Sequence, residues 1–267
     1  MRWVVCLCCI SLFAGQLEVE VHARSAILMN ADTGAILFEK EAHLPLSPGS
    51  TTKIATALYF LEQNPDLTRK ITVSKEAMRA RPASLKGDIA PWWHHSDGTM
   101  MGLKIGEVLT LEALWHGLIL VSGNDAANVI AEDVAGSVPE FMERVNEYLA
   151  QIGCKNTQYK TPSGLPDPEH WSTAYDLAWM MCKALKFPRF RAIISTPFYN
   201  TPATNKQPAR EMIAINAMLK PKNRHYYPKA IGGKTGNTVQ GKKALVAAAE
   251  QDGRTLVVAL LGCQESA

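Results

Sequence analysis

The strand-forming segments of this chain stand at its two ends, and this placement constrains the fold more than any other feature. Residues 25–29 and 35–39 are short apolar runs separated by a cluster of turn-forming residues. Residues 242–250 and 254–262 repeat the arrangement near the C-terminus. Strands so distant in sequence share a core by pairing in one sheet, so we predict an α/β (α+β) fold whose antiparallel sheet is built from both chain ends.

The long middle of the chain carries helical periodicity. Apolar residues recur at helical spacing over residues 51–62, 110–135, 140–151, 173–186 and 212–219. Residues that commonly cap helices stand at the start of three of these segments, namely Ser50, Thr110 and Ser172. We therefore expect an inserted helical lobe beside the sheet. A cleft between two such lobes is the usual place for a ligand.

Composition places the chain among ordinary globular proteins. Of its 267 residues, 47% are apolar and 20% are charged, which argues against a disordered chain or a multi-spanning membrane protein. The net charge of +3 is small, so we expect no nucleic acid as a partner. The basic stretch at residues 220–229 is interpreted as a solvated loop, with contact to acidic lipid or wall polymer as the alternative.

The N-terminus has the pattern of an export signal. Arg2 precedes an apolar run over residues 3–15, and the segment ends in small residues at Val21 and Ala23. This run is too short to span a bilayer. We expect a signal peptide over residues 1–23 and a mature chain over residues 24–267, with a buried first strand or an uncleaved anchor as the alternative.

Ser50 and Lys53 form the first motif that could carry a catalytic reaction. Residues three apart share one face of a helix, so the hydroxyl and the amine can come within hydrogen-bond reach. A serine hydroxyl becomes a good nucleophile when a neighbouring base takes its proton, and a lysine can act as that base when burial or nearby cations lower its pKa. Alone the pattern is weak, because a helix cap followed by a solvated lysine gives the same sequence.

Ser122, Gly123 and Asn124 form the second motif, which interrupts an apolar helical run. Polar residues at such a break can face a cleft. There Ser122 could transfer a proton to a leaving group, and Asn124 could hold Lys53 or a substrate amide. The alternative is an ordinary loop between two helices.

Lys234 and Thr235 lie in the third motif, a glycine-rich segment before the C-terminal hairpin. Glycines on a strand allow another backbone to approach closely, as an extended peptide docking on a sheet edge requires. The lysine and the threonine would then bind an anionic carboxylate. A phosphate-binding loop is excluded because the glycines lead into a strand and the required spacing is absent.

The ordered set of Ser-x-x-Lys at 50, Ser-x-Asn at 122 and Lys-Thr-Gly at 234 is the specific signal. Together with phrases such as SGNDAANVIAE and GGKTGNT, it resembles the low-molecular-mass penicillin-binding proteins that are serine-type D-alanyl-D-alanine carboxypeptidases. The resemblance implies a β-lactamase/transpeptidase-like fold. Its α/β lobe would span about residues 24–52 and 220–267, and its helical lobe about residues 53–219.

The resemblance also implies roles for individual residues. Ser50 would be the acylated nucleophile, Lys53 its base and Ser122 a proton relay. The expected substrate-binding residues are Asn124, Lys234, Thr235, Gly236 and Asn237. The backbone N–H groups of Ser50 and Asn237 would form the oxyanion hole. Asn237 stands where many relatives carry His or Tyr, which puts substrate preference and deacylation rate in doubt.

The implied partners are peptidoglycan stem peptides ending in D-Ala-D-Ala and β-lactam antibiotics, which would acylate the same serine. The resemblance implies a role in cell-wall biogenesis and cell shape. It also implies a periplasmic or cell-envelope location with peripheral membrane contact. It implies neither a metal nor an organic cofactor.

Two other functions remain open from sequence. A class A-like β-lactamase needs an extra carboxylate to activate water, and Glu169 is the one candidate in a plausible place. A non-catalytic peptidoglycan-binding or scaffold protein could keep the cleft, although the intact Ser50 and Lys53 argue against it. The irregular stretch over residues 79–103 could be a lid, or a loop pinned by its tryptophans.

Overall fold

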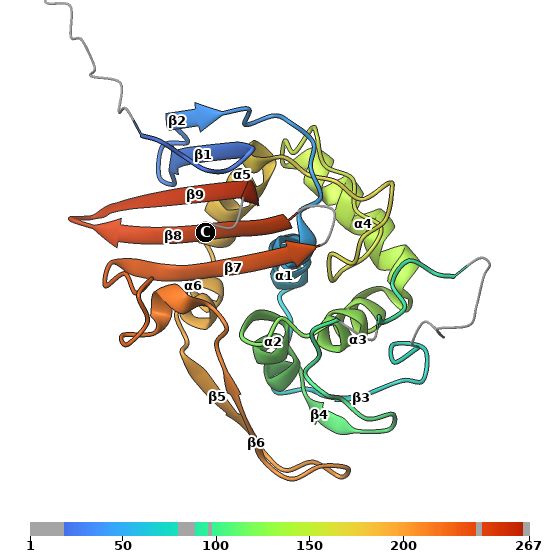
Figure 1. The fold of residues 1–267 in the computed structure, drawn as a ribbon. Helices are drawn as coiled ribbons and strands as arrows, with labels where there is room; N and C mark the ends of the chain where they lie inside the picture. The colour runs from blue at the N-terminus through green and yellow to red at the C-terminus, as the bar shows by residue number, and fades with distance from the viewer. Residues whose placement is uncertain (1–18, 80–88, 96–97, 239–241, 264–267) are drawn as a thin grey trace, which may run out of the picture.

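The computed structural model describes residues 19–79, 89–95, 98–238 and 242–263. Its centre is a five-stranded antiparallel sheet in the order β2-β1-β9-β8-β7 (Figure 1). The strands are β1 Ser25–Asn30, β2 Ile36–Lys40, β7 Ala230–Thr238, β8 Lys242–Gln251 and β9 Arg254–Cys263. Both predicted hairpins are confirmed, and β1 pairs with β9, so the two chain ends share one sheet.

Alternation along β9 explains why the two ends meet. Val257, Ala259 and Leu261 are fully buried, while the residues between them are only partly covered. The same holds on β1, where Ile27 and Met29 are fully buried. Burying such a face requires a partner layer.

The structure contains six α-helices and two short 3-10 helices among the described residues. The helices are α1 Lys53–Glu62, α2 Leu111–Ile119, α3 Asn124–Ala135, α4 Val138–Gln151, α5 Ala174–Ala184 and α6 Pro188–Ile194, and the 3-10 helices are η1 Gly49–Thr52 and η2 Ala217–Leu219. α5 packs on β1, β8 and β9, and α6 packs on β7 (Figure 1). α1 is buried along nearly its whole length and contacts α2, α3, α4 and α5. It is therefore the centre of the core.

Two small ribbons lie within the segment expected to be helical. β3 Lys70–Thr72 pairs with β4 Val108–Thr110, and β5 Phe198–Thr201 pairs with β6 Arg210–Ile213. The helix predicted over residues 212–219 is wrong. Burial alternates with period two from residue 212 to residue 216, with exposed Ile213 and Ile215 between buried neighbours. Apolar residues on both faces of an extended segment had mimicked a helical stripe.

The predicted caps are only partly confirmed. Thr110 caps α2 by accepting a hydrogen bond from the N–H of Ala113. Ser50 caps no helix, because it lies inside η1 and α1 begins at Lys53. α5 is capped by Thr173 instead of Ser172. The Ser172 hydroxyl instead lies 2.8 Å from the Thr157 hydroxyl.

Several sequence predictions fall outside the described residues. The signal peptide over residues 1–23 lies almost wholly there, and so do residues 80–88 and 96–97 of the stretch over residues 79–103. In the described part of that stretch, Trp92 packs against the core and Arg79 lies 5.2 Å from the centre of the Trp93 ring. Within the described ranges, no helix is long and apolar enough to cross a membrane.

Candidate active site

Ser50 and Lys53 meet where η1 runs into α1. Both residues adopt helical backbone angles, so their side chains emerge on one face, and the Lys53 amine lies 3.2 Å from Ser50 Oγ. Ser50 is partly exposed, whereas Lys53 is fully buried. A hydroxyl that solvent can reach is thus paired with an amine that it cannot.

The Lys53 amine has two further partners, which come from distant parts of the chain. It lies 2.8 Å from Asn124 Oδ1 and 2.7 Å from the carbonyl oxygen of Ser163. Both atoms can only accept hydrogen bonds. A neutral amine can donate its two hydrogens to them, which leaves its lone pair for the Ser50 hydroxyl proton. The arrangement therefore suits Lys53 as a proton acceptor.

Burial lowers the pKa of Lys53 well below its usual value of 10.5, and the nearby charge of Lys234 lowers it further. The carboxylate of Asp125 acts in the opposite direction. The neutral amine is therefore far more populated here than on an exposed lysine.

Ser122 lies on the turn between α2 and α3, and Asn124 is the first residue of α3. Ser122 adopts a left-handed backbone with φ of +59° and is 1% exposed, and among the described residues its hydroxyl has no hydrogen-bond partner. A non-glycine residue in this conformation costs about 1 kcal/mol or more, so surrounding contacts must hold it. An unpartnered buried hydroxyl beside Asn124 is free to meet a ligand or a proton in transfer.

β7 is an edge strand of the five-stranded sheet (Figure 1), and it packs against η1. A Cβ on Gly236 would lie 2.6 Å from the carbonyl oxygen of Pro48 and 3.3 Å from the Ser50 nitrogen. A Cβ on Gly232 would overlap the backbone of Ile194. These glycines are thus needed by the protein's own packing, a role the sequence did not indicate, and they place the strand beside Ser50.

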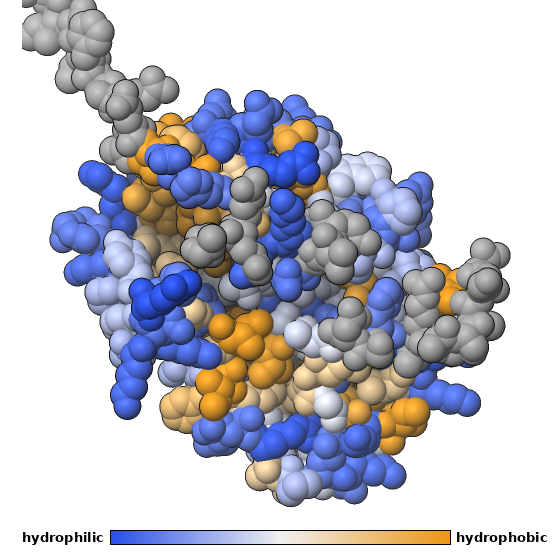
Figure 2. Space-filling view, in the orientation of Figure 1, coloured by the Kyte–Doolittle hydropathy of each residue, from blue (hydrophilic) through white to orange (hydrophobic). Residues whose placement is uncertain are grey.

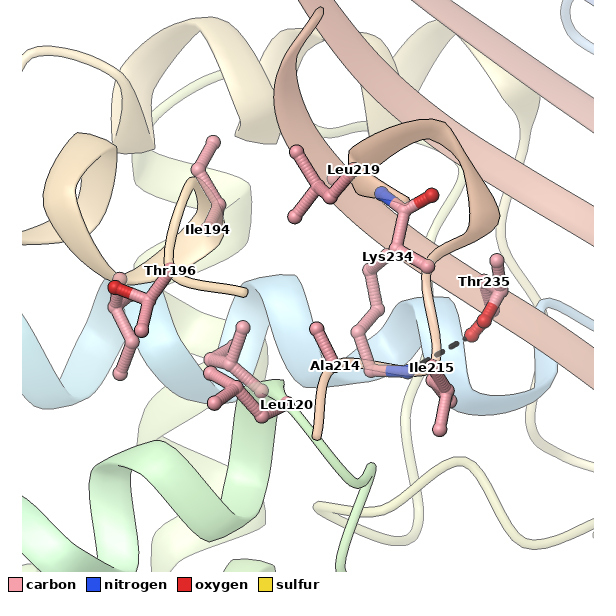
Figure 3. Close-up of a pocket in the computed structure, with 12 residues that line it drawn as sticks. Leu120, Ile194, Thr196, Ala214, Ile215, Leu219, Lys234 and Thr235 are labelled. Atoms are coloured by element: carbon pink, nitrogen blue, oxygen red, sulfur yellow. Dashed lines mark hydrogen bonds between the residues drawn. The ribbon is translucent and has the colours of Figure 1, made fainter. Parts of the chain in front are cut away.

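Lys234 is almost fully buried and lines a pocket together with Leu120, Ile194 and Leu219 (Figure 3). Its amine donates to the Thr235 carbonyl oxygen at 2.9 Å. Burial lowers the pKa of Lys234 to about 7. Of the other predicted residues on this strand, Thr235 is partly covered and Asn237 is exposed.

The loop over residues 157–171 carries contacts that the sequence analysis missed. Besides the Ser163 carbonyl, His170 lies 2.9 Å from Thr52 Oγ1 through Nε2 and accepts from the N–H of Lys160 at 3.1 Å through Nδ1. Burial lowers the pKa of His170 to about 3. Gly164, with φ of +85°, lies so close to η1 that a Cβ would overlap the Gly49 carbonyl. Because Lys53 binds a main-chain carbonyl of this loop, no side-chain pattern could reveal the contact.

Glu169 does not join the site. Its side chain is 68% exposed and forms an ion pair with Lys160 at 2.8 Å. The carboxylate that a class A-like β-lactamase would need is therefore turned to solvent at this position.

The geometry brings the Lys53 amine into contact with both Ser50 and Asn124, and β7 packs against η1 beside them. A sequence profile of the peptidase S11 family, described as D-alanyl-D-alanine carboxypeptidase, matches residues 13–265. The chain belongs to this family. The family assignment agrees with the resemblance seen in the sequence.

Individual relatives agree with the family assignment. The chain is 31% identical over 246 residues to D-alanyl-D-alanine carboxypeptidase DacF of Bacillus subtilis, which covers 92% of this chain and 58% of that protein. It is 32% identical over 264 residues to DacC of Escherichia coli, covering 94% of this chain and 60% of that protein. The chain thus spans about three-fifths of the length of these two relatives.

Solved structures share the fold over nearly the whole chain. A D-alanyl-D-alanine carboxypeptidase from Mycobacterium tuberculosis superposes with a TM-score of 0.80 at 30% identity, covering 95% of this chain and 88% of that one. The Streptomyces K15 DD-transpeptidase gives a TM-score of 0.80 at 28% identity, covering 93% of each chain. The predicted fold class is confirmed.

Proposed function

We propose that this protein is a serine-type D-Ala-D-Ala carboxypeptidase that removes the terminal D-alanine of peptidoglycan stem peptides through an acyl-enzyme on Ser50. The observation that carries the proposal is the buried Lys53 amine, which lies 3.2 Å from Ser50 Oγ and is otherwise held by two acceptors. Family membership supports the substrate class.

Acylation would proceed as one proton-coupled attack. Lys53 takes the Ser50 hydroxyl proton as Oγ bonds to the carbonyl carbon of the penultimate D-alanine. The backbone N–H groups of Ser50 and Asn237 stabilise the oxyanion. The C–N bond then breaks, and the departing amine of the terminal D-alanine takes a proton that Lys53 supplies through Ser122.

Deacylation would reverse these roles. A water molecule loses a proton to Lys53 as its oxygen adds to the ester carbonyl, and the Ser50 oxygen leaves and regains a proton. The net reaction is hydrolysis of one peptide bond. Penicillin would enter by the same acylation and leave slowly.

Lys234 and Thr235 would bind the terminal carboxylate, and Asn124, Gly236 and Asn237 would position the rest of the peptide along β7. Support comes from the burial of Lys234, whose amine, within the described residues, donates only to the backbone carbonyl of Thr235. A buried lysine without a carboxylate partner gains most from an anionic ligand.

The proposal is tested by D-alanine release from a pentapeptide stem, compared with turnover of a chromogenic β-lactam. We expect D-alanine release with slow β-lactam turnover, and loss of both in Ser50→Ala. Fast β-lactam turnover without D-alanine release would instead support a β-lactamase. Inactivity on both substrates would support a non-catalytic binding protein.

The location and domain limits form a further part of the proposal. We infer a signal peptide over residues 1–23, and a catalytic domain over residues 24–267 that works in the periplasm or cell envelope. N-terminal sequencing of the protein from fractionated cells should give a chain that starts at Arg24. A retained Met1 would contradict the inference.

Peripheral membrane contact would use the basic stretch over residues 220–229. Residues 221–229 are all exposed, and no acidic residue occurs between Glu211 and Glu250. A hydrophobic patch lies between β7 and the ribbon of β5 and β6 (Figure 2). We expect salt-sensitive sedimentation with anionic phospholipid vesicles and none with zwitterionic ones. Equal sedimentation with both would contradict it.

A further inference from the structure

Asp125 is a fully buried carboxylate that the proposed chemistry does not use. Its Oδ1 accepts from the backbone N–H of Met101 at 2.8 Å and of Ala126 at 2.9 Å, and its Oδ2 accepts from Gly102 at 2.8 Å and Leu103 at 3.0 Å. In the described part of the chain it forms no ion pair. Three consecutive N–H groups thus close around one anion.

The segment that Asp125 holds is the one that brackets the turn of Ser122 and Asn124. The Thr99 hydroxyl donates to the Ser122 carbonyl at 2.8 Å, and the Asn124 N–H donates to the Thr99 carbonyl at 2.9 Å. Gly98 and Asn124 are tightly packed, because a Cβ on Gly98 would lie 2.8 Å from Asn124 Nδ2. A shift of this segment would therefore move both side chains.

The left-handed backbone of Ser122 needs such outside support. We propose that Asp125 is the positioning residue of this site, tying the turn of Ser122 and Asn124 to the backbone of residues 101–103 and keeping a negative charge near Lys53. The inference rests on the proposed function, since it concerns how the same site is held together.

We call the hydrogen bonds between the Asp125 carboxylate and the N–H groups of residues 101–103 the clasp. The segment held by the clasp is also hydrogen-bonded to the ribbon of β5 and β6. Gln207 Nε2 donates to the Gly102 carbonyl at 2.9 Å and to Glu107 at 2.6 Å. Glu107 is fully buried and also accepts from Arg210 at 2.9 Å. Residues 101–103 are therefore held by hydrogen bonds to Asp125 on one side and to Gln207 on the other.

Five charged or titratable groups act on one another here. Lys53 is influenced by Lys234 on β7 and by Asp125 on α3, and His94 is influenced by Asp125, His95 and Lys53. The Asp125 carboxylate favours the protonated form of Lys53, and loss of its charge would remove that influence. The acid limb of a Lys53-dependent rate would then move to lower pH.

The test measures the rate of acylation by a fluorescent penicillin as a function of pH, per acylatable site. Asp125→Asn removes the charge and breaks the clasp. Gly102→Ala keeps the charge but strains the clasp, because Gly102 has φ of +85° with open space at its Cβ. The matched control is Asp176→Asn. Asp176 lies in the first turn of α5, is as buried as Asp125, and accepts hydrogen bonds from the Asn156 N–H and the Thr157 hydroxyl.

We expect Asp125→Asn to lower the plateau rate about tenfold or more and to move the acid limb to lower pH. Gly102→Ala should lower the plateau with an unmoved limb, and Asp176→Asn should stay within about twofold of the parent rate. The proposal is overturned if Asp125→Asn leaves plateau and limb unchanged, or if Asp176→Asn matches it. Absence of any labelling in the parent protein would instead refute the proposed function.

Discussion

The site has two buried lysines, and their surroundings differ. Lys53 meets three oxygens contributed by η1, by the start of α3 and by the loop over residues 157–171. Lys234 lies among apolar side chains and donates to one backbone carbonyl. The first environment satisfies a neutral amine and the second leaves a cation short of partners. One amine is thus suited to take a proton and the other to hold an anion.

The largest effect should come from removing the Lys53 amine. Lys53→Met should lower the acylation rate by about 10³-fold or more, because the amine that takes the Ser50 proton is lost. The measurement is penicillin labelling followed in time. Lys183→Met is the control, since the Lys183 amine lies on α5, 4.5 Å from the centre of the Trp179 ring. Equal loss in both variants would contradict a specific role for Lys53.

A substitution in the loop should disturb Lys53 without touching it. Gly164→Ala would force the loop away from η1, because its Cβ would overlap the Gly49 carbonyl. The Ser163 carbonyl would move with it, and we expect an acylation rate lower by about 100-fold. Gly136→Ala is the matched control, with φ of +82° and nothing within contact distance of its Cβ. Gly136→Ala should lower stability and leave the acylation rate unchanged. Equal acylation rates in the two variants would count against a role for the contact between Lys53 and the Ser163 carbonyl.

The Lys234 side of the comparison predicts a loss that depends on the substrate. Lys234→Met should lower the rate with a free-carboxylate peptide by about 10- to 100-fold, because a hydrogen bond to a charged group is lost. A C-terminally amidated peptide should be cleaved slowly by both proteins. The measurement is kcat/KM for the peptide pair. A similar loss with both peptides would show that Lys234 does not bind the carboxylate.

Carboxylate binding should also depend on pH. The pKa of Lys234 is about 7, so the amine is charged below pH 7 and loses its proton above it. Affinity should be full below pH 7 and fall by at most about tenfold per pH unit above it, since binding must then take up a proton. Binding of a D-Ala-D-Ala peptide to Ser50→Ala isolates this step from acylation. A profile that is equally flat with and without Lys234→Met would contradict the assignment.

The smallest effect concerns the free energy of unfolding and His170, which lies in the loop that contacts Lys53. The pKa of His170 is about 3 in the folded protein against 6.5 when exposed, so the unfolded chain binds the extra proton between these values. Stability therefore falls as pH drops from about 6.5 towards 3. His170→Asn should cost about 1 kcal/mol at pH 7 through lost hydrogen bonds, and should flatten that acid slope. Denaturant unfolding at several pH values checks this, and an unchanged slope would contradict it.

The sequence was sufficient to predict the features that depend on the pattern of side chains. Short apolar runs separated by turn-forming residues at both chain ends predicted the sheet, and the three-residue spacing of Ser50 and Lys53 predicted their contact. It was insufficient where backbone atoms carry the interaction. The Ser163 carbonyl and the N–H groups around Asp125 have no residue signature. The ribbon of β5 and β6 was misread because its exposed face is also apolar, as Ile213 shows.

The central claim is that Lys53 is a neutral amine at the pH at which the enzyme works. The most direct test is a pH titration of the lysine side-chain amines by NMR, with Lys53 assigned by the signal missing in Lys53→Met. The account predicts that Lys53 titrates well below 10.5, because burial and Lys234 both disfavour its charge. A Lys53 signal that stays that of an ammonium up to pH 10 would contradict the account.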